Sequence, residues 1–235
     1  MKHPIKTTQR KREQLNMVEI KLKAKGIFFD LDGTIVDSRD AYLEAAKIAF
    51  QEMGLKPPTL AAALEIPRRL EQNQSISDII KNVEPQKFLP IYLSTYYAVS
   101  AEKTRLIPGV ADMLEALSQK VKLALITMRN VPRSAVAAEL ENFGIAKYFT
   151  YIITAQGTHK PKPSPEALIK IVRELDVQMC DCVIVGDSVN DIRAGKAAGT
   201  KTVAVLSGLF TCEELAREKP DLILEDATKL TGYLM

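Results

Sequence analysis

The sequence has no tryptophan, few aromatic residues, three cysteines and no long apolar run. Cys180, Cys182 and Cys212 are too few for a disulfide framework and lack the spacing of a zinc site. No segment approaches the roughly 18 consecutive apolar residues of a membrane span, and the basic N-terminus lacks the apolar core of a signal peptide. These absences exclude a disulfide-stapled scaffold, and we expect a cytoplasmic protein without a membrane partner.

The small net charge of +3 is unevenly distributed along the chain. Residues 1–25 carry eight basic and two acidic side chains, which leaves the remaining residues with a slight excess of negative charge. The alternative of a nucleic-acid-binding arm rests on Arg10-Lys11-Arg12, a short run without interleaved aromatic residues or a recognised module around it. We therefore expect residues 1–25 to form a basic N-terminal tail or partly structured extension, and we do not expect nucleic acid as a partner.

Short apolar segments recur along the chain and are separated by stretches with helical spacing. Several are apolar on successive residues, which is typical of strands buried on both faces of a parallel sheet. They comprise residues 27–30, 123–127, 151–154, 183–186, 202–206 and 222–224. Their alternation with helices predicts an α/β fold, with a doubly wound (Rossmann-like) parallel sheet as its core.

One long interval contains no convincing strand. Between Val36 and Pro108, apolar residues recur at helical spacing, first from Tyr42 to Met53 and again from Phe88 to Val99. This pattern predicts an inserted all-helical domain at residues 38–107. The core then consists of residues 26–37 together with 108–235.

Acidic residues follow two of the predicted strands. Asp30 and Asp32 are two residues apart, so in an extended chain both side chains project to the same side, and Gly33 then allows a sharp turn. Two carboxylates this close repel each other unless a cation compensates, and Mg²⁺ is the hard cation that best suits oxygen ligands. Asp187 ends a second apolar strand, and Asp191 follows in the opening helix, where capping alone would also explain it. Two surface acids in a turn are the alternative interpretation of the first pair.

Two further strand ends carry polar groups suited to a phosphate. Thr127 ends an apolar strand, so its hydroxyl and the next free backbone N–H are placed to hold phosphate oxygens. The proline-rich stretch Lys160-Pro161-Lys162-Pro163 forces extended backbone and presents ammonium groups from a stiff loop. A plain strand-to-helix connector is the alternative for this stretch.

These four elements, in their order along the chain, resemble the motifs of the haloacid dehalogenase (HAD) superfamily. The order is Asp-x-Asp-Gly-Thr, strand-Thr, Lys-Pro-x-Pro and Gly-Asp-Ser-x-x-Asp. The resemblance covers nearly the whole chain from Gly26, and the helical insertion is similar to a C1-type cap. It implies a phosphatase near the phosphoglycolate phosphatases and β-phosphoglucomutases, with Mg²⁺ as cofactor and a small phosphorylated metabolite as partner. Because the dehalogenases of the superfamily lack a carboxylate at the position of Asp32, its presence favours phosphate chemistry.

The resemblance also implies a role for each site residue. Catalysis is assigned to Asp30 as nucleophile, Asp32 as general acid and base, and Lys160 as the neutralising cation, with Lys162 a solvated surface residue. Phosphate binding is assigned to Thr127, the Met128 N–H and Lys160. Metal binding is assigned to the side chains of Asp30, Asp187 and Asp191 and to the Asp32 backbone carbonyl.

The sequence leaves several questions open. Arg68 and Arg69 are candidates for binding a substrate carboxylate or second phosphate, although at least one of them fits a solvated helix face better. The same core chemistry would serve a hexose-phosphate mutase of the β-phosphoglucomutase type, and a receiver-like phospho-signalling domain is a non-enzymatic alternative. The substrate and the oligomeric state are not determined.

Overall fold

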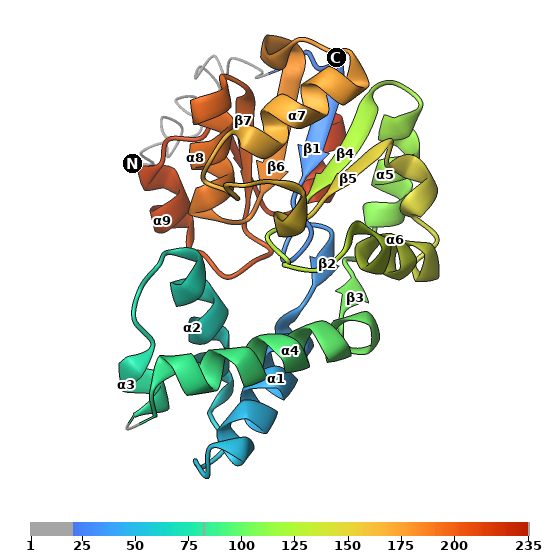
Figure 1. Ribbon diagram of the computed structural model, residues 1–235. Coiled ribbons are helices and arrows are strands. Elements are labelled where there is room, and N and C mark those ends of the chain that lie inside the picture. Colours follow the sequence, from blue (N-terminus) through green and yellow to red (C-terminus); the bar gives the residue numbers. More distant parts are fainter. Residues whose placement is uncertain (1–20, 82, 235) are drawn as a thin grey trace, which may run out of the picture.

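The computed structural model describes residues 21–81 and 83–234. At its centre is a parallel sheet of six strands, in the order β5-β4-β1-β6-β7-β8 (Figure 1). The chain enters in the middle at β1, proceeds outward through β4 and β5, and then crosses to the other side for β6, β7 and β8. This is the strand order of a doubly wound Rossmann-like sheet, so the predicted fold class is confirmed.

The elements have the following bounds. The strands of the sheet are β1 (Gly26–Phe29), β4 (Lys122–Ile126), β5 (Tyr151–Ile153), β6 (Cys182–Gly186), β7 (Lys201–Val205) and β8 (Leu222–Leu224). The helices are α1 (Arg39–Glu52), α2 (Leu60–Glu71), α3 (Ser77–Ile80), α4 (Pro85–Lys103), α5 (Val110–Ser118), α6 (Arg133–Asn142), α7 (Glu166–Leu175), α8 (Val189–Ala198) and α9 (Cys212–Arg217). The short elements are the strands β2 (Val36–Asp37) and β3 (Arg105–Leu106) and the 3-10 helices η1 (Ala146–Tyr148), η2 (Ala155–Gly157), η3 (Met179–Asp181) and η4 (Ala227–Tyr233).

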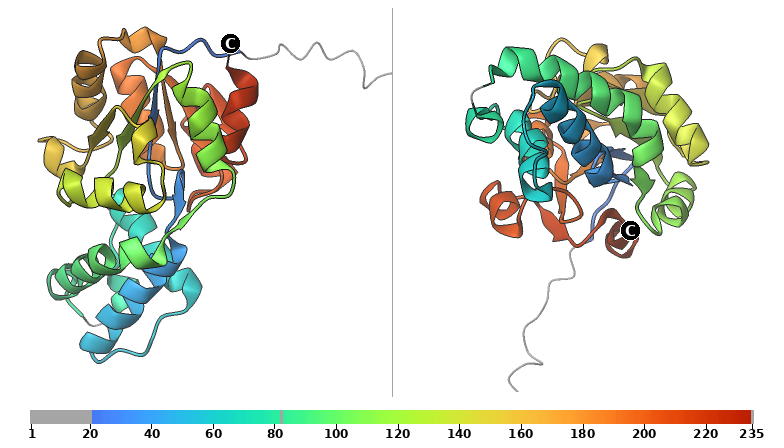
Figure 2. Two further views of the ribbon diagram at one scale, coloured as in Figure 1. Left: turned by 90° about the vertical axis from the view of Figure 1, so that its right-hand side faces the viewer. Right: turned by 90° about the horizontal axis from the view of Figure 1, so that it is seen from below.

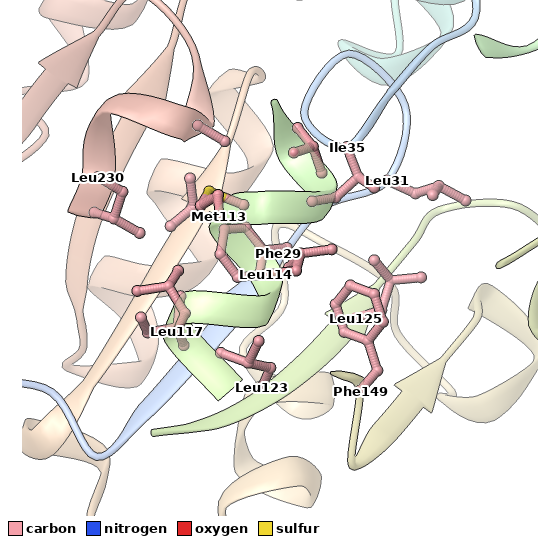
Figure 3. Close-up of a cluster of buried hydrophobic side chains, with 14 of the residues drawn as sticks. Phe29, Leu31, Ile35, Met113, Leu114, Leu117, Leu123, Leu125, Phe149 and Leu230 are labelled. Atoms are coloured by element: carbon pink, nitrogen blue, oxygen red, sulfur yellow. The ribbon is translucent and has the colours of Figure 1, made fainter. Parts of the chain in front are cut away.

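Helices cover both faces of the sheet. Successive residues of a strand point to opposite faces, so Phe29 joins an apolar cluster with α5, α6 and η4, whereas Phe28 packs against α7. Figure 3 shows the first cluster, in which Met113, Leu114 and Leu117 of α5 lie against strands β1 and β4. Because both faces are covered in this way, the carboxyl ends of the strands are where a ligand can bind.

Helices α1 to α4 form a separate layer beyond the carboxyl ends of the strands (Figures 1 and 2). They enclose an apolar cluster of their own, which includes Ala45, Ile66 and Phe88. The interval predicted to be all-helical also contains a short strand, β3. This strand pairs antiparallel with β2, and the two form the ribbon that links the helical layer to the sheet. The domain boundaries at 26–37, 38–107 and 108–235 stay a prediction.

Most of the predicted N-terminal tail, residues 1–20, lies outside the described residues. Of the rest of residues 1–25, Leu22 is buried and forms an isolated parallel bridge with Leu234. None of the helices in the described ranges combines the length and the apolar character needed to cross a membrane.

Candidate active site

Asp30 and Asp187 leave the sheet side by side. Phe29 of β1 pairs with Val185 of β6, and the Asp30 N–H donates to the Val185 carbonyl at 2.9 Å. Both aspartates therefore emerge at the carboxyl ends of adjacent strands. The strand order reverses between β1 and β6, which is the position where doubly wound sheets bind their ligands.

Three buried aspartates form a candidate metal site. Asp30, Asp187 and Asp191 each place a carboxylate oxygen within 4.8 Å of the others. Burial, followed by repulsion from its acidic neighbours, raises the pKa of Asp187 well above its ordinary value, and burial raises the pKa of Asp30 to about 7. A hard cation among these oxygens would remove the repulsion, so the residues fit a metal.

Two glycines allow the backbone to approach Asp187 closely. Gly33 has φ of +79°, a conformation that favours glycine, which confirms the predicted turn. A Cβ atom at Gly208 would lie 1.7 Å from Asp187 Oδ2, so a larger residue there would displace the carboxylate. The Thr34 hydroxyl donates to the other oxygen at 3.3 Å, and together these contacts orient Asp187 toward the site.

The lysine at the site is Lys162, and the prediction of Lys160 is wrong. Lys162 is only 4% exposed, and its Nζ donates to Asp30 Oδ1 and to Asp191 Oδ1 at 2.5 Å each. Although burial lowers the pKa of an ammonium group, the two carboxylates outweigh it and raise the pKa of Lys162 above its ordinary value. The prediction that Lys162 is a solvated surface residue is wrong for the same reason.

Contacts with helix α7 explain the difference between the two lysines. The backbone N–H groups of His159 and Lys160 donate to the Glu166 carboxylate at 2.7 and 3.0 Å, which fixes this stretch above the start of α7 and leaves the Lys160 side chain exposed. A signal was present in the sequence, because Lys162-Pro163-Ser164-Pro165 also matches Lys-Pro-x-Pro and directly precedes the helix.

Asp32 lies in a network of donors from both layers. Arg129 binds it in a bidentate manner, with Nε donating to Oδ2 at 2.8 Å and Nη2 to Oδ1 at 2.6 Å. The Tyr96 hydroxyl of α4 donates to Oδ1 at 2.8 Å, and Ser38 Oγ donates to the same oxygen. Although burial raises the pKa of a carboxyl group, these donors outweigh it and hold the pKa of Asp32 below its ordinary value. The carboxylate form is therefore favoured here.

Arg129 is a site residue that the sequence interpretation missed. It is 4% exposed and pairs through Nη1 with Glu139 of α6 as well as with Asp32. The backbone N–H of Arg129 donates to the Thr127 hydroxyl at 3.2 Å, so the turn after β4 brings both residues to the site. Its position in the Thr-Met-Arg turn was the available signal, but only the fold shows that its side chain turns inward.

A cavity opens between the sheet and the helical layer. Its core side is lined by Asp30, Asp32, Thr127, Met128, Arg129, Lys162 and Ser188, and its other side by Tyr42, Pro67, Leu70, Glu71, Tyr92, Leu93, Tyr96 and Tyr97. The structure thus brings Asp30, Asp32, Thr127 and Met128 to one cavity.

Arg68 and Arg69 lie outside this lining. Arg68 pairs with Glu65 and Glu214, and Arg69 pairs with Glu65 and Asp78. Their charges are therefore matched by carboxylates away from the cavity, and neither guanidinium is placed to bind a substrate in this conformation.

Comparison with known proteins places this arrangement in a family. Residues 27–205 match the model of the haloacid dehalogenase-like hydrolases. A phosphoglycolate phosphatase of Pseudomonas fluorescens (strain Pf0-1) is 33% identical over 213 residues, covering 87% of this chain and 77% of that protein. The phosphoglycolate phosphatase of Escherichia coli (strain K12) is 32% identical over 234 residues, with 89% and 92% covered.

A solved structure agrees with these matches. The crystal structure of a predicted phosphoglycolate phosphatase from Haemophilus somnus 129pt superposes with a TM-score of 0.70 at 26% identity, covering 88% of this chain and 96% of that one. The match extends over both the sheet and the helical insertion, and it agrees with the family match in sequence. The chain therefore belongs to the haloacid dehalogenase-like hydrolase family.

Proposed function

We propose that the protein is a Mg²⁺-dependent phosphatase that hydrolyses a small phosphate monoester, of the phosphoglycolate or sugar-phosphate type, through an aspartyl-phosphate intermediate. One observation carries the proposal: Asp30 and Asp32 open onto the same cavity, with the Lys162 ammonium 2.5 Å from Asp30. A nucleophile, a second carboxylate for proton transfer and a buried cation are thus assembled around one position.

In the first half of the reaction, a carboxylate oxygen of Asp30 attacks phosphorus and the bond to the ester oxygen breaks. For this step Asp32 must carry a proton, which it gives to the leaving oxygen, and Lys162 balances negative charge on Asp30 and the phosphoryl group. The Thr127 hydroxyl and the Met128 N–H hold the non-bridging oxygens of the phosphoryl group.

In the second half, Asp32 takes a proton from a water molecule, whose oxygen attacks the phosphorus of the aspartyl phosphate. The bond between phosphorus and Asp30 then breaks and inorganic phosphate leaves. The donors from Arg129, Tyr96 and Ser38 favour the ionised form of Asp32, which is the form this step needs.

The side chains of Asp30, Asp187 and Asp191 would hold the Mg²⁺ ion, and the Asp32 backbone carbonyl is proposed as a further ligand. When bound, the ion supplies positive charge opposite the Asp30 carboxylate and the phosphoryl oxygens. The Asp191 carboxylate also accepts from the Ser188 N–H and hydroxyl at 3.1 and 2.9 Å, so the helix cap orients this ligand.

Metal binding should stabilise the protein in a pH-dependent way. Burial raises the pKa of Asp30 to about 7, whereas in the unfolded chain the group ionises near about 4. Without metal, Asp30 in the folded state keeps a proton that the unfolded chain has already released, so the contribution of Asp30 to stability is greatest below about pH 4 and is lost as the pH rises through about 7. Since Mg²⁺ binds the ionised groups, we expect it to raise Tm more at about pH 8 than at about pH 5. Thermal unfolding with Mg²⁺ or EDTA checks this, and an equal effect at both pH values would contradict it.

The proposed activity predicts Mg²⁺-dependent release of phosphate from p-nitrophenyl phosphate, with EDTA abolishing it. Isomerised sugar phosphate without free phosphate would favour a mutase instead. A long-lived aspartyl phosphate without turnover would indicate a receiver-like domain, and the absence of any phosphoryl transfer would refute the proposal.

A further inference from the structure

Glu71 is a carboxylate of the helical layer that reaches the active site. It ends α2, and its backbone carbonyl accepts from the Asn190 side chain of α8 at 2.6 Å, which holds the end of α2 against the core. Its side chain lines the cavity together with Asp30 and Lys162. Its Oε2 atom is buried and has no hydrogen-bond partner among the described residues.

A buried carboxylate oxygen without a donor is costly, so the surroundings of Glu71 indicate what is missing. Burial, followed by the charges of Asp30 and Asp191, raises its pKa to about 8. Glu71 is not part of the group of three aspartates whose oxygens lie close enough to share a metal. A donor group on the substrate would satisfy this oxygen.

A second polar atom in the same cavity is in the same situation. The Tyr92 hydroxyl of α4 is buried and without a hydrogen-bond partner in the described part of the chain. A hydroxyl group on a substrate both donates and accepts, so it can satisfy Glu71 and Tyr92 alike. A carboxylate accepts only, so it could pair with the Tyr92 hydroxyl but offers no donor to the Glu71 Oε2 atom.

The cations of the cavity lining are already paired. Lys162 contacts Asp30 and Asp191, whereas Arg129 contacts Asp32 and Glu139. Among the described lining residues, these two cations are therefore already occupied by protein carboxylates, and neither is left to bind a carboxylate on the leaving group. The rest of the wall on this side is formed by Pro67, Leu70, Leu93 and tyrosine rings, which suit the carbon-hydrogen face of a sugar or polyol.

We propose that Glu71 and Tyr92 select the leaving group, and that the substrates are hydroxyl-rich phosphate monoesters, sugar or polyol phosphates, rather than phosphate esters of a hydroxy acid. This inference rests on the proposed phosphatase function. It assigns substrate specificity to side chains of the helical layer, while the core residues carry out the chemistry.

The test compares kcat/KM for glucose 6-phosphate, ribose 5-phosphate and 2-phosphoglycolate in the wild type, Glu71→Gln and Glu52→Gln. Glu52 is an exposed glutamate at the end of α1, outside the cavity lining, so this control removes the same charge. In the wild type and in Glu52→Gln, we expect kcat/KM for the better of the two sugar phosphates to exceed that for 2-phosphoglycolate by about tenfold or more. Glu71→Gln should reduce this ratio by about tenfold. A wild-type preference for 2-phosphoglycolate, or an unchanged ratio in Glu71→Gln, would overturn the inference.

Two further measurements separate specificity from other roles. The first measures how strongly each of the three compounds inhibits the hydrolysis of p-nitrophenyl phosphate. The inhibition constants report the preference for sugar phosphate over 2-phosphoglycolate even where turnover is slow, and they should show the same ratio. Calorimetric titration with Mg²⁺ alone should give equal affinities for the wild type and Glu71→Gln; a tenfold weaker affinity would make Glu71 part of the metal surroundings and overturn the inference. Hydrolysis of p-nitrophenyl phosphate tests the proposed function independently, because it contains no hydroxyl-rich leaving group.

Discussion

Asp30→Asn is expected to reduce kcat for p-nitrophenyl phosphate by on the order of 10⁴-fold or more, because an amide cannot replace a carboxylate as the attacking nucleophile. The protein should remain folded. Burial already raises the pKa of Asp30 to about 7, so the fold tolerates an uncharged group at this position, and Lys162 keeps Asp191 as a partner. Phosphate release and circular dichroism, measured on the same preparation, check both parts.

The matched control for this change is Asp40→Asn. Asp40 is exposed in the first turn of α1 and lies outside the cavity lining, so the substitution removes one negative charge without touching the site. Its activity should stay within about twofold of the wild type, as for most surface substitutions. Full activity in Asp30→Asn would refute the aspartyl-phosphate mechanism.

Replacing Lys162 by methionine is expected to lower kcat by on the order of 10²- to 10³-fold. The buried ammonium group is the partner of both Asp30 and Asp191, and its loss leaves two carboxylates facing each other. Removing one member of a buried ion pair costs about 3–5 kcal/mol, so the free energy of unfolding should fall as well. Chemical denaturation and phosphate release, both with Mg²⁺ present, measure the two effects.

Lys160→Met distinguishes the two lysines of the proline-rich loop. The Lys160 side chain is exposed, and the contacts of its residue with Glu166 come from the backbone, so the variant should retain activity and stability. The reverse outcome, a large loss in Lys160→Met with little change in Lys162→Met, would support the lysine first inferred from the sequence and contradict the arrangement described above.

The fold could be predicted from the sequence because its signals are local. Strands buried on both faces produce continuous apolar runs such as the one before Asp30, and the helical layer shows apolar residues at helical spacing, as around Phe50. The short pairing of β2 with β3 could not be predicted, because it joins two-residue segments that lie about seventy residues apart and carry no periodic pattern.

The candidate site could be predicted where a residue's position follows from the end of a strand. Asp30, Thr127 and Asp187 all lie at the carboxyl ends of parallel strands, and such strand ends converge whatever the connecting segments are. Arg129 was missed because the direction of a side chain beyond a strand end depends on partners from distant segments, here Asp32. Glu71 was missed because the position of a helix end also depends on such partners, here the Asn190 side chain, which donates to the Glu71 backbone carbonyl.

The sequence by itself determined the sheet, the helical insertion and the acidic residues around which phosphate chemistry can be built. It contained two overlapping Lys-Pro-x-Pro patterns, starting at Lys160 and at Lys162, and local pattern alone does not distinguish them. Only the tertiary structure decided that Lys162 faces Asp30. The physical reason is that an ammonium group becomes buried where carboxylates compensate its desolvation. Those carboxylates come from the residue after β1 and from α8, 132 and 29 residues away along the chain.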